Sequence, residues 1–166
     1  GGASGFGGGG IGNKTSRFYR ALVKTELAAS VGSGVWPSLD PFLYVIDVTL
    51  RDGRTLEEVE AALFAELDKA AAGGITQAEL EKARKQARAL FAYSTETVTN
   101  QAFWLAYFEH IAGSYEWFLT FEDRLRAVTL DDVHAAARQY LRPSQRTVGW
   151  FVPTALTGDE TDADDE

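Results

Sequence analysis

Three helix-start signals recur in this chain of 166 residues and constrain its fold more than any other feature. In each, a threonine stands three residues before an acid: Thr55 before Glu58, Thr76 before Glu79 and Thr129 before Asp132. In such a capping box the threonine oxygen accepts a hydrogen bond from the third helical N–H, and the acid accepts one from the threonine N–H. The pattern predicts helices over about 55–72, 76–93 and 129–141.

Apolar spacing predicts the remaining elements. Residues 15–26 carry the apolar stripe of a surface helix, and residues 42–50 (FLYVIDVTL) are rich in the β-branched and aromatic residues typical of a strand. The other predicted elements are a strand over 27–35, helices over about 99–111 and 115–127, and a closing strand over 146–152. With few strands and many helices, the predicted fold class is α+β, a small, mainly antiparallel sheet covered by helices on one face.

Composition narrows the functional classes. The hydrophobic fraction of 45% is that of one globular domain, and no apolar run approaches the length of a membrane span. The absence of cysteine excludes disulfides, thiolate zinc sites and cysteine nucleophiles. Of the 24 acids, six lie in residues 159–166, so the rest of the chain has 18 acids against 16 bases. A nearly neutral body without a basic stripe argues against nucleic-acid binding.

The glycine-rich stretch 5–16 (GFGGGGIGNKTS) is the strongest candidate for a functional loop, because ordering so many glycines is entropically expensive. It formally contains the G-x-G-x-x-G of dinucleotide sites and nearly matches the phosphate-loop pattern. No strand precedes it, however, and Asn13 separates the last glycine from Lys14 and Thr15. Both nucleotide-binding interpretations are therefore rejected.

A zinc site and a serine nucleophile are rejected as well. Residues 106–110 (AYFEH) lack the first histidine of H-x-x-E-H, and the chain has only two histidines, His110 and His134. No catalytic residue and no metal ligand are predicted. The aromatic clusters within 103–108 and 117–121 recur at helical spacing and are predicted to pack in the core.

Six segments share their order and spacing with a known family: 16–22 (SRFYRAL), 27–31 (LAASV), 51–59 (RDGRTLEEV), 75–84 (ITQAELEKAR), 124–129 (RLRAVT) and 140–143 (YLRP). Together they resemble the pitrilysin/insulinase zinc metallopeptidases, which include the mitochondrial processing peptidase. The resemblance implies a LuxS/MPP-like metallohydrolase half-domain, and within the family it points to the C-terminal half, which lacks the zinc ligands. The glycine-rich stretch is similar to the loop of the non-catalytic α subunit of the processing peptidase, which is associated with gripping the substrate.

The resemblance divides the chain into a glycine-rich loop (1–16), a half-domain lacking its first strand and helix (17–153) and an acidic tail (154–166) expected to be disordered. The positions where the family's C-terminal half carries an arginine and a tyrosine fall at Leu22 and Ala29, so that pair is missing. The expected substrate-binding residues are those of the loop: Phe6, Gly7, Gly8, Gly9, Gly10, Ile11, Gly12 and Asn13.

The expected function is that of a non-catalytic, substrate-handling half of a zinc metallopeptidase. Such a chain is inactive alone and carries no cofactor, because the zinc lies on the catalytic half or on a homologous partner subunit. That partner is also expected to cover the open edge of the sheet. An extended peptide is the expected substrate, held by strand addition at an edge. The alternative is an inactive structural or assembly subunit of a peptidase-like complex that makes no contact with the peptide.

Overall fold

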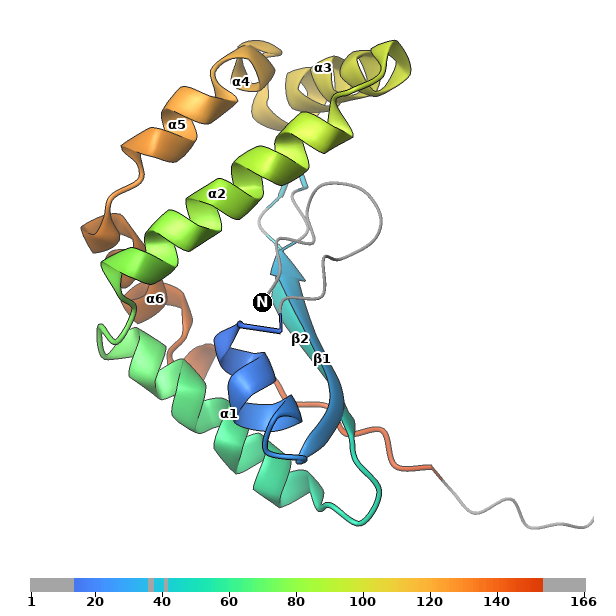
Figure 1. Cartoon of the computed structure of the whole chain (residues 1–166), viewed down its shortest axis with the longest axis vertical. Helices are drawn as coiled ribbons and strands as arrows, with labels where there is room; N and C mark the ends of the chain where they lie inside the picture. Colours follow the sequence, from blue (N-terminus) through green and yellow to red (C-terminus); the bar gives the residue numbers. More distant parts are fainter. Residues whose placement is uncertain (1–13, 36–37, 41, 154–166) are drawn as a thin grey trace, which may run out of the picture.

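The computed structural model describes residues 14–35, 38–40 and 42–153 (Figure 1). The elements in chain order are a π-helix η1 (Tyr19–Val23), strands β1 (Ala28–Val35) and β2 (Tyr44–Leu50), helices α1 (Leu56–Ala71), α2 (Gln77–Ser94), α3 (Val98–Ala112), α4 (Glu116–Leu119), α5 (Phe121–Ala127) and α6 (Leu130–Tyr140), and a 3-10 turn η2 (Pro143–Gln145).

The core forms where η1 packs between the hairpin and α1. Strands β1 and β2 pair in antiparallel register, with Val31 opposite Val48. Leu22 of η1 is completely buried, and Val59 and Leu67 of α1 pack in the same cluster. Figure 1 shows the helices gathered on one side of this two-stranded sheet. The predicted α+β class, a small antiparallel sheet with helices on one face, is confirmed.

The predicted helix starts are confirmed at all three capping boxes. Thr55, Thr76 and Thr129 each accept from the third helical N–H, and the acid at that position accepts from the threonine N–H. A fourth threonine, Thr97, caps α3 through its oxygen. Gly113 ends α3 with a φ of 72°, a left-handed conformation in which glycine is favoured because it has no Cβ.

Helix α2 carries the chain away from the sheet, and α3, α4 and α5 lie around its far half (Figure 1). Aromatic side chains hold this part together. The rings of Phe91 and Phe121 stack with centroids 4.2 Å apart, and the Trp104 indole donates to the Ser94 carbonyl at 3.0 Å. Trp104 is buried, but Phe103 and Trp117 are 58% and 38% exposed, so the predicted core role is wrong for these two residues.

The predicted closing strand over 146–152 is wrong. These residues belong to no strand in the structure, and side-chain contacts with α1 take the place of a hydrogen-bonded ladder. The Trp150 indole donates to the Glu60 carboxylate at 3.0 Å. The Arg146 guanidinium lies 4.8 Å from the ring centroid of Phe64 and forms an ion pair with Asp68. The partners lie one helical turn apart on one face of α1: Glu60, Phe64 and Asp68.

Two predicted helices differ in extent. The helix predicted over 15–26 is limited to a short turn at 17–18 followed by η1. The helix predicted over 115–127 is interrupted at Thr120, whose hydroxyl donates to the Glu116 carbonyl at 2.7 Å. None of the described helices combines the length and the apolar character required to cross a membrane. The tail over 154–166 lies outside the described residues.

Candidate functional site

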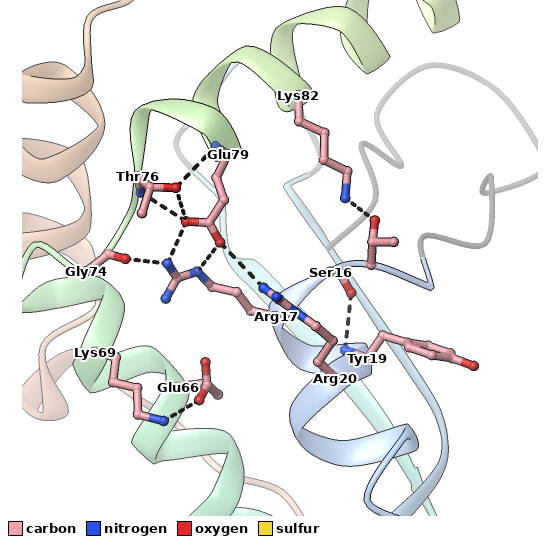
Figure 2. Close-up of polar contacts among 11 residues, drawn as sticks. Ser16, Arg17, Tyr19, Arg20, Glu66, Lys69, Gly74, Thr76, Glu79 and Lys82 are labelled. Carbon is pink, nitrogen blue, oxygen red and sulfur yellow. Dashed lines mark hydrogen bonds and ion pairs between the residues drawn. The ribbon is translucent and has the colours of Figure 1, made fainter.

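The predicted substrate-binding residues, Phe6 to Asn13, lie outside the described residues, but the segment that follows them is described. Lys82 of α2 donates a hydrogen bond to the Thr15 hydroxyl. Ser16 accepts from the backbone N–H groups of Tyr19 and Arg20, at 3.2 and 3.1 Å (Figure 2). The end of the glycine-rich stretch is therefore attached both to η1 and to α2.

The π-helix η1 sets the direction of the side chains that follow. Its hydrogen bonds span five residues, as between the Lys24 N–H and the Tyr19 carbonyl at 2.9 Å. Such wider turns are rare and occur frequently at functional sites. Phe18 and Leu22 enter the core, whereas Arg17 and Arg20 extend toward the start of α2 (Figure 2).

An arginine–carboxylate pair forms the centre of this site. The Arg17 Nε and Nη2 atoms donate to the two oxygens of Glu79 at 2.8 and 2.6 Å, and Nη2 also donates to the Gly74 carbonyl. Both side chains are mostly buried, with 25% and 30% of their surface exposed. This two-point geometry fixes both partners and is stronger than a single hydrogen bond between neutral groups.

The carboxylate of Glu79 has a second role, because it also completes the capping box of α2. Its Oε2 accepts from the Thr76 N–H at 2.9 Å and from the Thr76 hydroxyl at 3.0 Å. The hydrogen bonds from Arg17, followed by those from Thr76, lower the pKa of Glu79 to about 2. The same pairing raises the pKa of Arg17. Glu79 is therefore a fixed anion at neutral pH, unsuited to act as a general base.

Beside this pair lies an open cavity of about 370 Å³ that we call the arginine hollow. It is lined by Arg17, Arg20, Ala21 and Glu66. The Arg20 side chain is 56% exposed, and its Nη2 is 3.7 Å from the nearer Glu79 oxygen. Glu66 is bound by Lys69 at 2.6 Å. The hollow thus presents one tightly paired arginine and one loosely held arginine to solvent (Figure 2).

The two positions matched to the family's arginine and tyrosine have aliphatic side chains here, Leu22 and Ala29. Leu22 is fully buried in the core, and Ala29 is an exposed residue of β1. The two histidines are also separate: His110 is exposed near the end of α3, and the Nε2 of His134 lies 2.9 Å from the Ile75 carbonyl. Within residues 14–35, 38–40 and 42–153, no three His, Asp or Glu side chains are grouped to hold a metal ion.

The sequence contains a signal for the Arg17–Glu79 pair only in hindsight. Arg17 and Glu79 both lie in segments that carry the family resemblance, but the sequence pattern gives Glu79 only the role of a capping acid. A sequence separation of 62 residues hides the contact, which arises because Arg17, just before η1, lies beside the turn that joins α1 to α2 and also donates to the Gly74 carbonyl of that turn.

Comparisons with known proteins agree with this picture. Residues 5–87 match the family model described as the peptidase M16 inactive domain. The chain is 31% identical to a proposed zinc protease from Bordetella pertussis Tohama I, with a TM-score of 0.75, covering 85% of this chain and 78% of that one. It is 30% identical to the inactive peptidase domain of a proposed zinc protease from Bordetella parapertussis, with a TM-score of 0.77, covering 87% and 79%.

A protease from Helicobacter pylori shares the fold, with a TM-score of 0.72 at 22% identity, over 80% of this chain and 32% of that one. A search of curated protein sequences found no match. The family match over half of the chain and the identity to the Bordetella structures lead to one conclusion. The chain belongs to the peptidase M16 family and is an inactive domain of that family.

Proposed function

We propose that this chain is the substrate-handling, non-catalytic half of a zinc peptidase, and that its glycine-rich residues 6–13 hold an extended peptide beside the active site of a catalytic half. The observation that carries the proposal is the anchoring of the segment that directly follows these residues. Thr15 is held by Lys82, and Arg17 by Glu79 and Gly74. A glycine-rich segment attached to so firm a base can adapt to varied peptides while its position remains set.

The described residues do not fit a zinc site. The chain has no cysteine, its two histidines lie apart, and among the described residues no three His, Asp or Glu side chains are grouped as the ligands of a catalytic zinc would be. We therefore derive no catalytic step through zinc on this chain. In this proposal the metal and the general base belong to the catalytic half, and this chain positions the peptide. Positioning alone contributes substantially to peptidase rates, because it replaces a random encounter by a bound geometry.

The test is deletion of residues 5–13 in the complex of this chain with its zinc-bearing half. We expect kcat/KM for an extended peptide to fall by about 10- to 100-fold while the two halves still copurify. Deletion of residues 159–166, which removes six acids from the other end, is the control and should leave kcat/KM unchanged. Unchanged turnover after the loop deletion would contradict the proposal and favour a purely structural subunit.

A further inference from the structure

We propose that the arginine hollow binds a carboxylate of the peptide substrate through Arg20, so that this half-domain favours peptides with an acidic group near the held segment. The carboxylate comes either from an Asp or Glu side chain or from the peptide's own C-terminus. This inference rests on the proposed function and adds a substrate class to it.

The first argument concerns the hydrogen-bonding state of Arg20. Its one ion-pair partner among the described residues is Glu79, at 3.7 Å, which is beyond hydrogen-bond length. Both oxygens of Glu79 already accept shorter bonds, at 2.6 and 2.8 Å from Arg17 and at 2.9 and 3.0 Å from Thr76. The Arg20 guanidinium therefore keeps donors for a ligand, and more than half of its side-chain surface is exposed to meet one.

The second argument is the charge balance of the hollow. Two of the nearby cations have a close carboxylate each: Arg17 binds Glu79 at 2.6 Å, and Lys69 binds Glu66 at 2.6 Å. Arg20 is the third cation and has no carboxylate of its own. One uncompensated positive charge favours an anion with a single negative charge, and the planar guanidinium matches a carboxylate at two points.

The same balance argues against a phosphate group. A phosphate carries nearly two negative charges at neutral pH and would lie close to both Glu66 and Glu79. Like charges at such separations repel, and Arg20 alone supplies the compensating charge. A carboxylate carries a single negative charge and meets about half of this repulsion, and a hollow of about 370 Å³ has room for it.

The third argument is position. The hollow follows the proposed peptide-holding residues closely in the sequence, because Arg17 and Arg20 come within five residues of Thr15 and Ser16. Arg20 follows Asn13, the last of the residues proposed to hold the peptide, by only seven positions in the sequence, so the proposal assigns both to one binding region. The site adds selectivity to a glycine-rich segment that by itself has little means of distinguishing one side chain from another.

The experiment measures binding of fluorescent peptides to the full 166-residue chain by anisotropy. Two short peptides of one neutral sequence, both with an amidated C-terminus, differ only in a single Asp or Asn. A third peptide has Asn and a free C-terminal carboxylate. We expect one of the two carboxylate-bearing peptides to bind about tenfold more tightly than the neutral peptide, and which of them does so identifies the source of the carboxylate.

The variant Arg20→Gln should remove this preference and leave the affinity for the neutral peptide unchanged, while Arg20→Lys should restore part of it. Arg88→Gln is the matched control, because Arg88 of α2 is also a helical arginine with one ion pair, to Glu122 at 3.2 Å, and its side chain is similarly exposed, at 53%. It should leave the preference intact. Since Arg20 is largely exposed, all variants should unfold at the same temperature as the parent chain.

Equal binding of all three peptides, or a preference that survives Arg20→Gln, would overturn the carboxylate site. So would the absence of any binding at about 1 mM peptide. These failures are distinguishable from failure of the proposed function, which depends on turnover by the two-part complex after deletion of residues 5–13. If turnover by the complex falls after deletion of residues 5–13 but peptide binding does not depend on the acidic group, the substrate-handling function stands and only the carboxylate site is refuted.

Discussion

Replacement of Glu79 by glutamine tests whether the arginine pair stabilises the fold at the base of the glycine-rich segment. The pKa of Glu79 falls from 4.5 to about 2 through hydrogen bonds from Arg17 and then Thr76. At about 1.4 kcal/mol for each tenfold change in proton affinity, this shift corresponds to at most ~3.4 kcal/mol. Because 30% of the Glu79 side chain is exposed, solvent screening reduces the expected loss to about 1–2 kcal/mol at pH 7.

The sign of the pH dependence follows from the lowered pKa. The ionised carboxylate contributes its full stability above the ordinary pKa of 4.5, and this contribution is lost as the pH falls toward about 2. Glutamine has no charge to lose. The difference in unfolding free energy between the parent chain and Glu79→Gln should therefore be largest at pH 7, and should shrink as the pH is lowered below about 4.5.

Urea unfolding followed by tryptophan fluorescence at several pH values provides the measurement. The matched control is Glu58→Gln, because Glu58 occupies the same capping-box position in α1 but, among the described residues, accepts from Thr55 and forms no ion pair with an arginine. This control should cost about 0.5 kcal/mol, the size of a weakened cap. Equal losses for the two variants at pH 7, or a loss for Glu79→Gln that is the same at pH 3, would refute the reasoning.

Three further predictions concern the core, one turn and the metal. Leu22→Ala should lower the unfolding free energy by about 2–5 kcal/mol, because Leu22 is fully buried between the sheet and α1; a loss below about 1 kcal/mol in urea unfolding would contradict that packing. Gly74→Ala should lower the melting temperature, because the new Cβ would lie 2.6 Å from the Lys69 carbonyl oxygen. Gly32→Ala should leave the melting temperature unchanged, because a Cβ there has no neighbouring atom within 4 Å. Equal melting temperatures for the two variants would refute the predicted clash at Gly74. Metal analysis of the purified chain should find no stoichiometric zinc, and one tightly bound zinc per chain would overturn the assignment of the metal to another half.

Much of the fold could be predicted because its signals are local. The helix starts at Thr55, Thr76 and Thr129 depend on atoms within four residues, and each forms as predicted. The end of α3 at Gly113 and the core of the strand 42–50 are equally local, since backbone conformation and β-branched side chains act over a few residues. The family resemblance added the expectation of a metallohydrolase half-domain.

The errors arise where a distant partner decides the structure. Residues 146–152 are as β-branched and aromatic as a strand, but a strand requires a neighbour with which to pair. In the structure the neighbour of this segment is a helix, and the contacts of Trp150 with Glu60 and of Arg146 with Phe64 determine its course. The predicted core position of Phe103 is wrong for the same reason. Helical spacing indicates which residues share a face of the helix but not whether another element covers that face.

The candidate site also depends on contacts between residues that are distant in the sequence, which local sequence patterns do not indicate. The capping box of α2 requires an acid at position 79, and this local role accounts for Glu79. The sequence therefore gives no reason to expect a second partner for its carboxylate. Arg17 then contributes a contact across 62 residues that converts a helix cap into the anchor of the glycine-rich segment. Once Arg17 has taken both oxygens of that carboxylate, Arg20 has no close acceptor there. The availability of Arg20 is thus a consequence of tertiary packing, and only the structure distinguishes it from the arginines that are already paired.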